Sequence, residues 1–176
     1  KDGELSAFLR FGNDFNQNYY EVEIPLKVTK WTDGNFAEEV WPEDNNLTIP
    51  LELLTKMKIL AMQNPDQVDV NGVLTKMEHE IDPTVAIDNS KLKISVKGNP
   101  NFGLVRTLMM GVRNNTGSEP LNLPKRSVSG EVWFNELRLA GMDNKGGMAA
   151  IMSMDANLAD FARISATGRM STIGFG

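Results

Sequence analysis

A period-two alternation of apolar and polar residues runs through most of the chain and predicts β-strands. Between residues 4 and 11, the apolar positions on one side are Leu5, Ala7, Leu9 and Phe11. Between residues 19 and 28, they are Tyr20, Val22, Ile24, Leu26 and Val28. The segment 12–18 between these runs is rich in Gly and Asn, which tolerate the positive φ of turns, so we expect a hairpin. Pro25 has no amide donor, and we therefore place the second strand at an edge or beside a bulge.

One segment has the spacing of a helix. Its apolar residues recur at helical intervals, at Leu53, Leu54, Met57 and Leu60. Thr48 can cap this segment and Pro50 suits a first helical position, so we predict a helix over about 50–62. Residues 64–83 are polar and have no strong period, which indicates a loop.

Three further strands are predicted after that loop. They correspond to the sequences KLKISV, VRTLMMGV and GEVWFNELRL, at residues 91–96, 105–112 and 130–139. Asn135 and Glu136 interrupt the alternation of the last strand, which predicts a bulge there. Several antiparallel strands with one helix in a connection are typical of a jelly-roll β-sandwich. We therefore predict an all-β fold with one inserted helix, with residues 1–140 forming an antiparallel, jelly-roll-like β-sandwich domain.

The pattern changes after residue 140. Residues 141–148 are rich in Gly and predict a flexible joint, and residues 149–176 contain two alternating runs of nine or ten residues. That is the length a tilted strand needs to cross a bilayer, and apolar-outward alternation over it is typical of an outer-membrane barrel hairpin. A soluble antiparallel sheet with one hydrated face gives the same alternation. The candidate lipid-facing residues are Ala150, Met152, Met154, Ala156, Leu158, Ala162, Ile164, Ala166 and Met170.

Composition and charge exclude several classes of function. The chain has 176 residues and a formal net charge of −5, so no overall positive field exists to hold nucleic acid. It has no Cys, which excludes a disulfide framework, a thiolate nucleophile and a Cys-ligated zinc site. It also has no 18-residue apolar run, and residues 1–11 contain no apolar signal-peptide segment but predict a strand. We take the chain to be a piece of something longer.

Few residues have the grouping that catalysis or metal binding requires. His79 is the single His and lies between Glu78 and Glu80, where adjacent side chains of an extended loop diverge, so we expect a solvated loop histidine. Glu21 and Glu23 share one strand face, which we interpret as a solvated, solubilising face. No nucleophile motif or phosphate-binding loop accompanies these residues. We therefore predict no enzymatic activity, no catalytic residue and no cofactor.

The residue types alone suggest two binding sites. Asn13 and Asp14 are weak candidates for a structural calcium, because their oxygens are suitable ligands while their spacing does not fit an EF-hand loop and turns use the same residues. Aromatic side chains offer a sugar-binding surface, as in carbohydrate-binding modules, although such rings more often belong to a core or an interface. These aromatic residues are Trp31, Trp41, Trp133, Tyr19 and Tyr20.

Several blocks of the sequence resemble the SprA/Sov family, the giant outer-membrane translocon of the type 9 secretion system in Bacteroidota. They are FLRFGNDFNQNYYEVEIPL, VWPEDNNLTIPLELL, GNPNFGLVRTLMMGVRN, GEVWFNELRLAGMDNKGGMAA and the terminal GFG. These blocks extend through nearly the whole chain, and the block WFNELRL with its downstream Asp-Asn-Lys-Gly-Gly is the most specific.

The resemblance implies a structural role in protein transport, linked to gliding motility, at the bacterial outer membrane and cell surface. The chain would be a globular segment inserted between the strands of a single-chain barrel that exports folded cargo proteins, followed by a hairpin that resumes the barrel wall. Implied partners are exported cargo, other barrel and plug subunits of the secretion system, and the lipid bilayer through the hairpin. A freestanding carbohydrate-binding or cell-surface adhesion module is the alternative that a sandwich alone would support.

Overall fold

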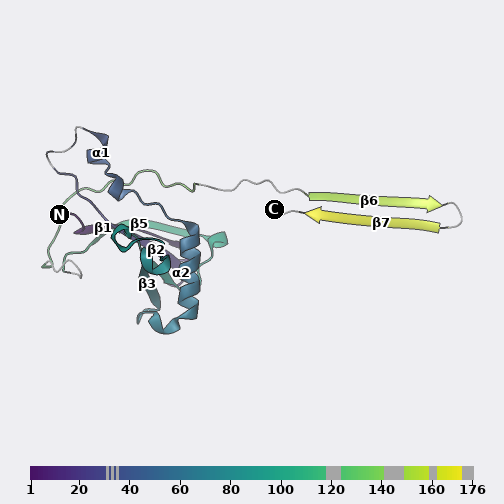
Figure 1. The fold of residues 1–176 in the computed structure, drawn as a ribbon, viewed down its shortest axis with the longest axis horizontal. Coiled ribbons are helices and arrows are strands. Elements are labelled where there is room, and N and C mark those ends of the chain that lie inside the picture. The colour runs from purple at the N-terminus through teal and green to yellow at the C-terminus, as the bar shows by residue number, and fades with distance from the viewer. Residues whose placement is uncertain are drawn as a thin grey trace. The chain divides into compact units, whose positions relative to one another are not determined.

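The computed structural model describes residues 1–30, 32, 34, 36–117, 124–140, 149–158 and 162–171. For several positions of the last two ranges it describes the backbone alone. The chain divides into two units, Lys1–Val132 and Trp133–Gly176 (Figure 1). The Gly-rich joint predicted at 141–148 lies outside the described residues.

The first unit contains a five-stranded antiparallel sheet. Its strands lie in the order β3-β4-β2-β1-β5, and each strand pairs antiparallel to its neighbours. The predicted hairpin of the first two strands is confirmed, because Ala7 pairs with Ile24 and Phe11 with Tyr20. The strands are β1 (Leu5–Gly12), β2 (Tyr19–Pro25), β3 (Val73–Met77), β4 (Lys93–Lys97) and β5 (Thr107–Asn114).

Two predictions about this sheet were wrong. The strand that contains Pro25 is not an edge strand but lies between β1 and β4. Pro25 is its last residue, opposite Ser6, so the missing donor falls where the strand ends. The segment 64–83 is not all loop, because it holds β3, whose five residues are too few to show a clear period. Leu74 of β3 is buried and pairs with Val96 of β4.

Helix α2 (Leu51–Gln63) confirms the predicted helix to within one residue at each end. Pro50 occupies the capping position with an extended backbone, and no side chain, including that of Thr48, makes a capping hydrogen bond. The helix is therefore stabilised mainly by packing its apolar side onto the sheet. Figure 1 shows α2 lying against the sheet. The shared core consists of Tyr20, Val22, Ile24, Leu53, Leu54, Met57, Leu74, Ile81, Leu92, Ile94 and Val96.

The shorter elements were not predicted. They are α1 (Ala37–Val40), α3 (Glu78–Ile81) and four 3₁₀ turns, at Glu43–Asn45, Pro65–Gln67, Ile87–Asn89 and Phe102–Leu104. One-turn elements have no amphipathic period of their own. Phe102 of the last turn is exposed, although its ring stacks on that of the buried Tyr20 with centroids 4.9 Å apart.

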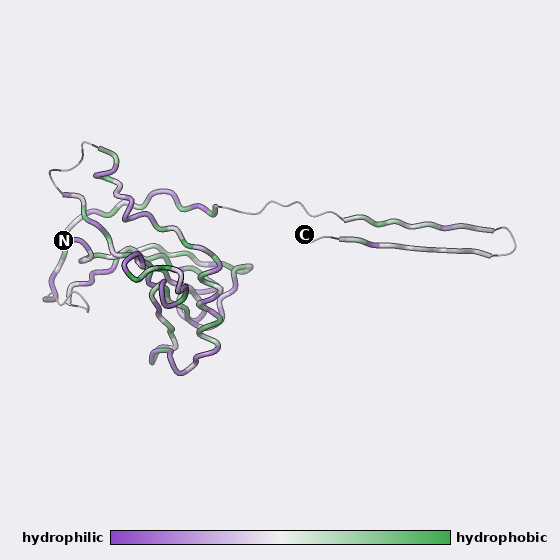
Figure 2. The backbone as a smooth tube through the Cα atoms, in the orientation of Figure 1, coloured by the Kyte–Doolittle hydropathy of each residue, from purple (hydrophilic) through white to green (hydrophobic). Residues whose placement is uncertain are grey.

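The predicted all-β, antiparallel fold with one inserted helix is confirmed in part, because the structure is mainly β and antiparallel with few helices, whereas the jelly-roll pairing is not observed. Across the described part of Lys1–Val132 there is one sheet, and α2 occupies the position of the second sheet of a sandwich. One helix is enough to cover the short central strands, so the apolar face of β2 and β4 is buried without a facing sheet. Figure 2 shows hydrophobic and hydrophilic residues interspersed along these strands.

The strand predicted at 130–139 is also absent from the structure, where residues 124–140 belong to no helix or strand. Glu136 is the one described residue other than Gly with a positive φ, 52°. Because no strand forms there, the bulge predicted at Asn135 and Glu136 is not observed. The second unit contains the remaining strands, β6 (Ala149–Leu158) and β7 (Ala162–Ser171), which form a separate two-stranded sheet.

Candidate functional site

The hairpin of β6 and β7 places the predicted apolar positions in phase. The predicted apolar residues of both runs have even residue numbers, and the antiparallel register pairs each even-numbered residue with another even-numbered residue. One side of the ribbon therefore receives small or apolar residues at every pair along its length. These pairs are Ala150–Met170, Met152–Gly168, Met154–Ala166, Ala156–Ile164 and Leu158–Ala162.

The alternate pairs occupy the other side of the ribbon and are mostly polar. They are Ala149–Ser171, Ile151–Arg169, Ser153–Thr167, Asp155–Ser165 and Asn157–Arg163. Each run by itself shows only an alternation, whereas the register shows that the two alternations agree. The ribbon thus has one apolar side and one polar side over ten residues.

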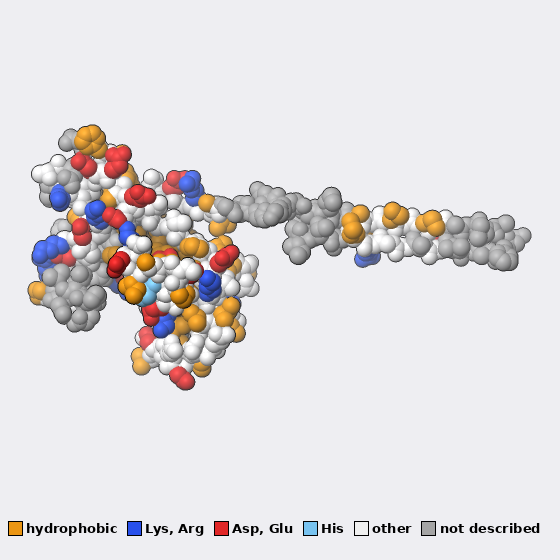
Figure 3. Space-filling view, viewed as in Figure 1, with side chains coloured by type: hydrophobic (Ala, Val, Ile, Leu, Met, Phe, Trp, Pro, Cys, Tyr) orange, Lys and Arg blue, Asp and Glu red, His pale blue; other side chains and the backbone are white. Residues whose placement is uncertain are grey.

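The apolar side is exposed wherever its side chains are described. Met152 is 76% exposed and Met154 is 57% exposed, and Ala150 and Met170 are also exposed. For the other predicted lipid-facing residues, Ala156, Leu158, Ala162, Ile164 and Ala166, the backbone alone is described. Figure 3 shows hydrophobic side chains along one long side of this hairpin. An isolated two-stranded hairpin is marginally stable in water at best, so this ribbon requires neighbours.

Among the described residues, no helix combines the length with the apolar character that a membrane crossing needs.

A second candidate is a charged cluster on the face of the sheet opposite α2. Arg10 Nε donates to Glu21 Oε2 at 2.7 Å, and Arg113 Nη2 donates to Glu21 Oε1 at 2.9 Å. Glu23 accepts hydrogen bonds from Ser6 Oγ at 2.7 Å, from Lys93 Nζ at 3.1 Å and from Arg113 Nη1. The cluster therefore joins four neighbouring strands through two carboxylates. We call these six residues, Ser6, Arg10, Glu21, Glu23, Lys93 and Arg113, the carboxylate cluster.

The carboxylate cluster overturns the prediction of a solvated Glu21 and Glu23. Their side chains are 8% and 7% exposed, because the long side chains of Arg10 and Arg113 cover them. Burial by itself would raise the pKa of Glu23, but the Ser6 hydrogen bond and the charges of Lys93 and Arg113 outweigh it and lower that pKa. Both carboxylates have their oxygens satisfied by the protein, and the cluster holds strands together rather than presenting an acid or a base.

The cluster contributes two arginines that sequence reasoning missed. Arg113 also lies over the ring of Phe8, with 5.1 Å between its guanidinium carbon and the ring centroid. A Cβ at Gly111 would lie 2.6 Å from Cζ of that ring, so Gly111 leaves room for Phe8. The sequence does show opposite charges at alternate positions of separate strands. Which of these charges meet can be known only from the strand order.

The calcium candidates Asn13 and Asp14 serve as turn residues. Asp14 Oδ1 accepts the backbone N–H groups of Asn16 at 2.8 Å, Gln17 at 2.5 Å and Asn18 at 3.2 Å. Asn13 Oδ1 accepts the N–H of Asn101 at 2.9 Å. These oxygens are already used by protein donors that fix the loop between β1 and β2. Within the described residues, no group of three or more His, Cys, Asp or Glu could hold a metal ion.

The Asp14 turn makes stability depend on pH. The Gln17 N–H, with the Asn18 side chain and the Asn16 N–H, lowers the pKa of Asp14 from 3.8 to about 2. A carboxylate with a lowered folded pKa stabilises the fold above its unfolded pKa, and this contribution is lost as the pH falls. We expect Asp14→Asn to flatten the fall in melting temperature between about pH 4 and pH 2. Thermal melts across this range test it, and a slope equal to that of the unsubstituted protein would contradict it.

His79 belongs to α3 rather than to a loop and is half-buried. Its backbone N–H donates to Ser90 Oγ at 3.1 Å, and its ring Nδ1 lies 3.0 Å from the same oxygen. The predicted solvated loop histidine is therefore wrong. The side chain has a local structural contact, and the flanking Glu80 is engaged with the backbone N–H of Met77 at 2.7 Å.

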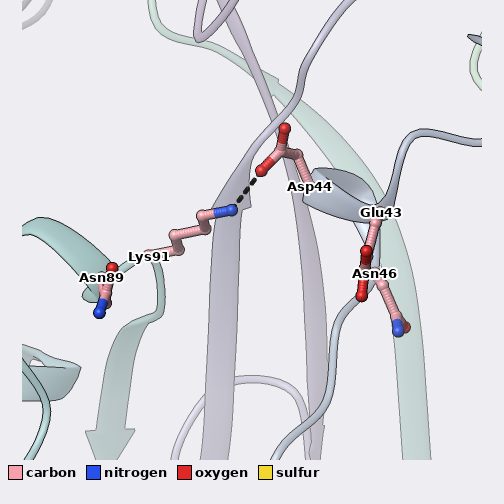
Figure 4. A pocket seen from close by; sticks show the side chains of 5 residues that line it. All are labelled: Glu43, Asp44, Asn46, Asn89 and Lys91. Atoms are coloured by element: carbon pink, nitrogen blue, oxygen red, sulfur yellow. Dashed lines mark hydrogen bonds and ion pairs between the residues drawn. The ribbon is translucent and has the colours of Figure 1, made fainter.

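A shallow surface hollow is lined by Glu43, Asp44, Asn46, Asn89 and Lys91. Figure 4 shows Lys91 reaching Asp44, while Glu43, Asn46 and Asn89 do not converge on the same point. Lys27 Nζ binds the other oxygen of Asp44 at 2.9 Å. The hydrogen bonds from Lys91 and Lys27 lower the pKa of Asp44 to about 2. The hollow is thus an ion-paired junction between loops and not a converging catalytic group.

The aromatic residues considered for sugar binding do not form one platform in the part of the first unit that is described. Tyr20 is in the core, and Tyr19 is buried beneath the guanidinium of Arg10, 4.1 Å from its ring centroid. Trp41 is exposed in the first unit and Trp133 is exposed in the second. Trp31 lies outside the described residues.

Comparisons with known proteins bear on these candidates. No curated protein and no solved structure matches the chain. A family model named SprA_N, described as motility related/secretion protein, matches residues 1–176 and confirms the resemblance seen in the sequence blocks. Because the match covers the whole chain, the protein belongs to the SprA_N family of motility related/secretion proteins.

Proposed function

We propose that this chain is a structural segment of a giant outer-membrane β-barrel translocon that exports folded proteins by type 9 secretion, a system linked to gliding motility. The observation that carries the proposal is the register of β6 and β7. It pairs apolar positions with apolar positions over ten residues. Strands of this length with one apolar and one polar side suit a barrel wall between lipid and a water-filled lumen.

The physical requirements of the hairpin support this role. Its outer strand edges need partners, and an apolar side needs an apolar environment, because neither is satisfied in a free two-stranded ribbon. Inside a bilayer every backbone group must be paired, which strands achieve only in a closed barrel. Neighbouring strands of a larger barrel would complete the ladder on both edges. Family membership supports secretion or motility as the process and the cell envelope as the location.

We propose no turnover and no cofactor, and exported cargo with other barrel and plug subunits as partners. The carboxylate cluster supports this reading, since its acids are held by Arg10, Arg113, Lys93 and Ser6. In this role the sheet unit is a globular insertion in the barrel chain, and the hairpin forms part of the barrel wall.

Cysteine labelling tests the role of the hairpin. Single cysteines at Met152, Met154 and Met170 would face lipid, whereas cysteines at Ser153 and Asp155 would face the aqueous lumen. In intact cells carrying the whole protein, we expect a membrane-impermeant maleimide to label the second group and spare the first. These 176 residues contain no native Cys, so the unsubstituted protein measures the background from the rest of the molecule.

Controls separate lipid from protein burial. Denatured samples should label equally at every site, which shows that each cysteine is intact. A lipid-soluble maleimide should reach Met154→Cys in folded protein, since lipid rather than packed protein surrounds it. Water-accessible labelling at positions on both sides of the ribbon would contradict a barrel wall.

A further inference from the structure

The outer edge of β5 is an open strand edge with apolar side chains. Within the described residues β5 pairs with β1 and with no other strand. Leu108, Met110 and Val112 pair with Phe11, Leu9 and Ala7, so they lie on the core face of the sheet, yet they remain exposed. Open apolar edges are normally covered, charged or shortened, because they recruit further strands.

The backbone groups of the same three residues point toward that edge. The N–H of Asn115 donates to the carbonyl of Glu4 at 2.8 Å. Hydrogen-bonded pairs alternate along an antiparallel ladder, so the odd-numbered positions of β5 bond to β1. Leu108, Met110 and Val112 therefore direct their N–H and C=O groups outward, where an added strand would bind them.

The chain itself returns to this edge just after β5. Asn114 Nδ2 donates to the carbonyl of Arg126 at 2.8 Å, and the N–H of Arg126 donates to Thr116 Oγ1 at 3.1 Å. A Cβ at Gly117, whose φ is 81°, would lie 2.8 Å from Cβ of Lys125. The two arms of this connection are thus in contact at one end of β5, which fixes where a register between β5 and the chain after Arg126 would begin.

The returning segment has the alternation that such a strand needs. In residues 127–132, Ser127, Ser129 and Glu131 are polar and exposed, while Val128 and Val132 are half-buried. Pairing Arg126 with Asn114 sets Val128 opposite Val112, Gly130 opposite Met110 and Val132 opposite Leu108. Both valines then join the apolar side chains of β5, whereas a slip by one residue would bring the polar residues there.

We propose that residues 127–132 form a sixth strand on the outer edge of β5, antiparallel and in the register Asn114–Arg126. The outward N–H and C=O groups of Leu108, Met110 and Val112 bind the added strand. The same chain supplies that strand, from the segment that returns after β5. This covers the apolar edge within one molecule and leaves β3 as the sheet edge that remains open to another chain.

Engineered disulfides in the full chain test the register without interference from native cysteines. Cysteines at opposed antiparallel positions lie within bridging distance, so Val112→Cys with Val128→Cys should oxidise within one molecule. The matched pair Val112→Cys with Ser129→Cys places the thiols on opposite faces and should oxidise at least about tenfold more slowly. Equal rates for the two pairs would overturn the proposal.

Two further outcomes also overturn it. Faster bridging of Val112→Cys with Gly130→Cys would show a different register, and disulfide-linked dimers at low protein concentration would show that a second copy occupies the edge.

Amide exchange gives a readout that needs no cysteine. The N–H groups of Met110 and Val112 should exchange at least about tenfold faster in Val128→Pro than in the unsubstituted chain, because the proline interrupts the added strand. Unchanged exchange would contradict the sixth strand.

Discussion

Replacing Met154 with Arg is expected to cost about 2 to 4 kcal/mol in the assembled protein, the largest effect of any single change in the hairpin. Met154 pairs with Ala166 near the middle of the ribbon, on its apolar side. In the proposed barrel this position lies near the bilayer midplane, where a guanidinium loses its hydration. The measurement is the free energy of unfolding of the intact protein in lipid vesicles, together with its yield in the outer membrane.

Position along and across the strand provides the controls. Ser153→Arg lies one residue away on the polar side and should cost little. Ala150→Arg lies on the apolar side near the end of the strand, where the polar interface reduces the cost to about 0 to 1 kcal/mol. A packed soluble interface would instead give costs that follow local burial and not depth. Equal costs at Ala150 and Met154 would therefore contradict the membrane interpretation.

Removing the Glu23 side chain is expected to destabilise the sheet unit by about 2 to 3 kcal/mol. Glu23 is buried and accepts hydrogen bonds from Ser6, Lys93 and Arg113. Glu23→Ala leaves these donors without their acceptor. The loss should fall below the usual cost of breaking a fully buried ion pair, because Lys93 and Arg113 are partly exposed and can regain water. Denaturant unfolding of the full chain measures the change.

A double-mutant cycle shows whether the loss comes from the ion pair. Glu23→Ala combined with Arg113→Ala should be less destabilising than the sum of the two single changes, with a coupling of at least about 1 kcal/mol. The control is Asp44→Ala, which removes an exposed ion pair with Lys27 and Lys91 and should cost much less. Additive losses for Glu23 and Arg113 would show that the carboxylate cluster is not a cooperative unit.

The elements that sequence reasoning predicted correctly have a local signal. Strands β1, β2, β4 and β5 and the two hairpin strands show a period of two, and α2 shows its helical spacing together with Pro50. A period arises from each residue's own neighbours along the chain, so it needs no tertiary information. The predicted apolar positions of the hairpin depended on the same local signal, and the sequence blocks that indicated the family are local as well.

Elements that lack a period were missed or misplaced. Strand β3 has five residues, and its Leu74 belongs to the core shared with α2 and pairs with Val96, 22 positions further along the chain. Pro25 suggested an edge strand because it lacks a backbone N–H. It is the last residue of β2, however, where strand pairing does not require that donor. The segment 130–139 has a strand pattern but is not a strand in the structure, which shows that a pattern alone does not make a strand without ladder pairing.

The sequence by itself determined the longer elements with a clear period, which hairpin positions are apolar and to which family the protein belongs. The tertiary structure alone decided the strand order and, with it, the carboxylate cluster. Arg113 meets Glu23 and Glu21 across 90 and 92 positions of sequence, through β1 and β2 as neighbours. The sequence around a charged residue does not show which residue of another strand it will contact. The side chain's chemistry is local, whereas the distance between two side chains is set by how the whole sheet pairs.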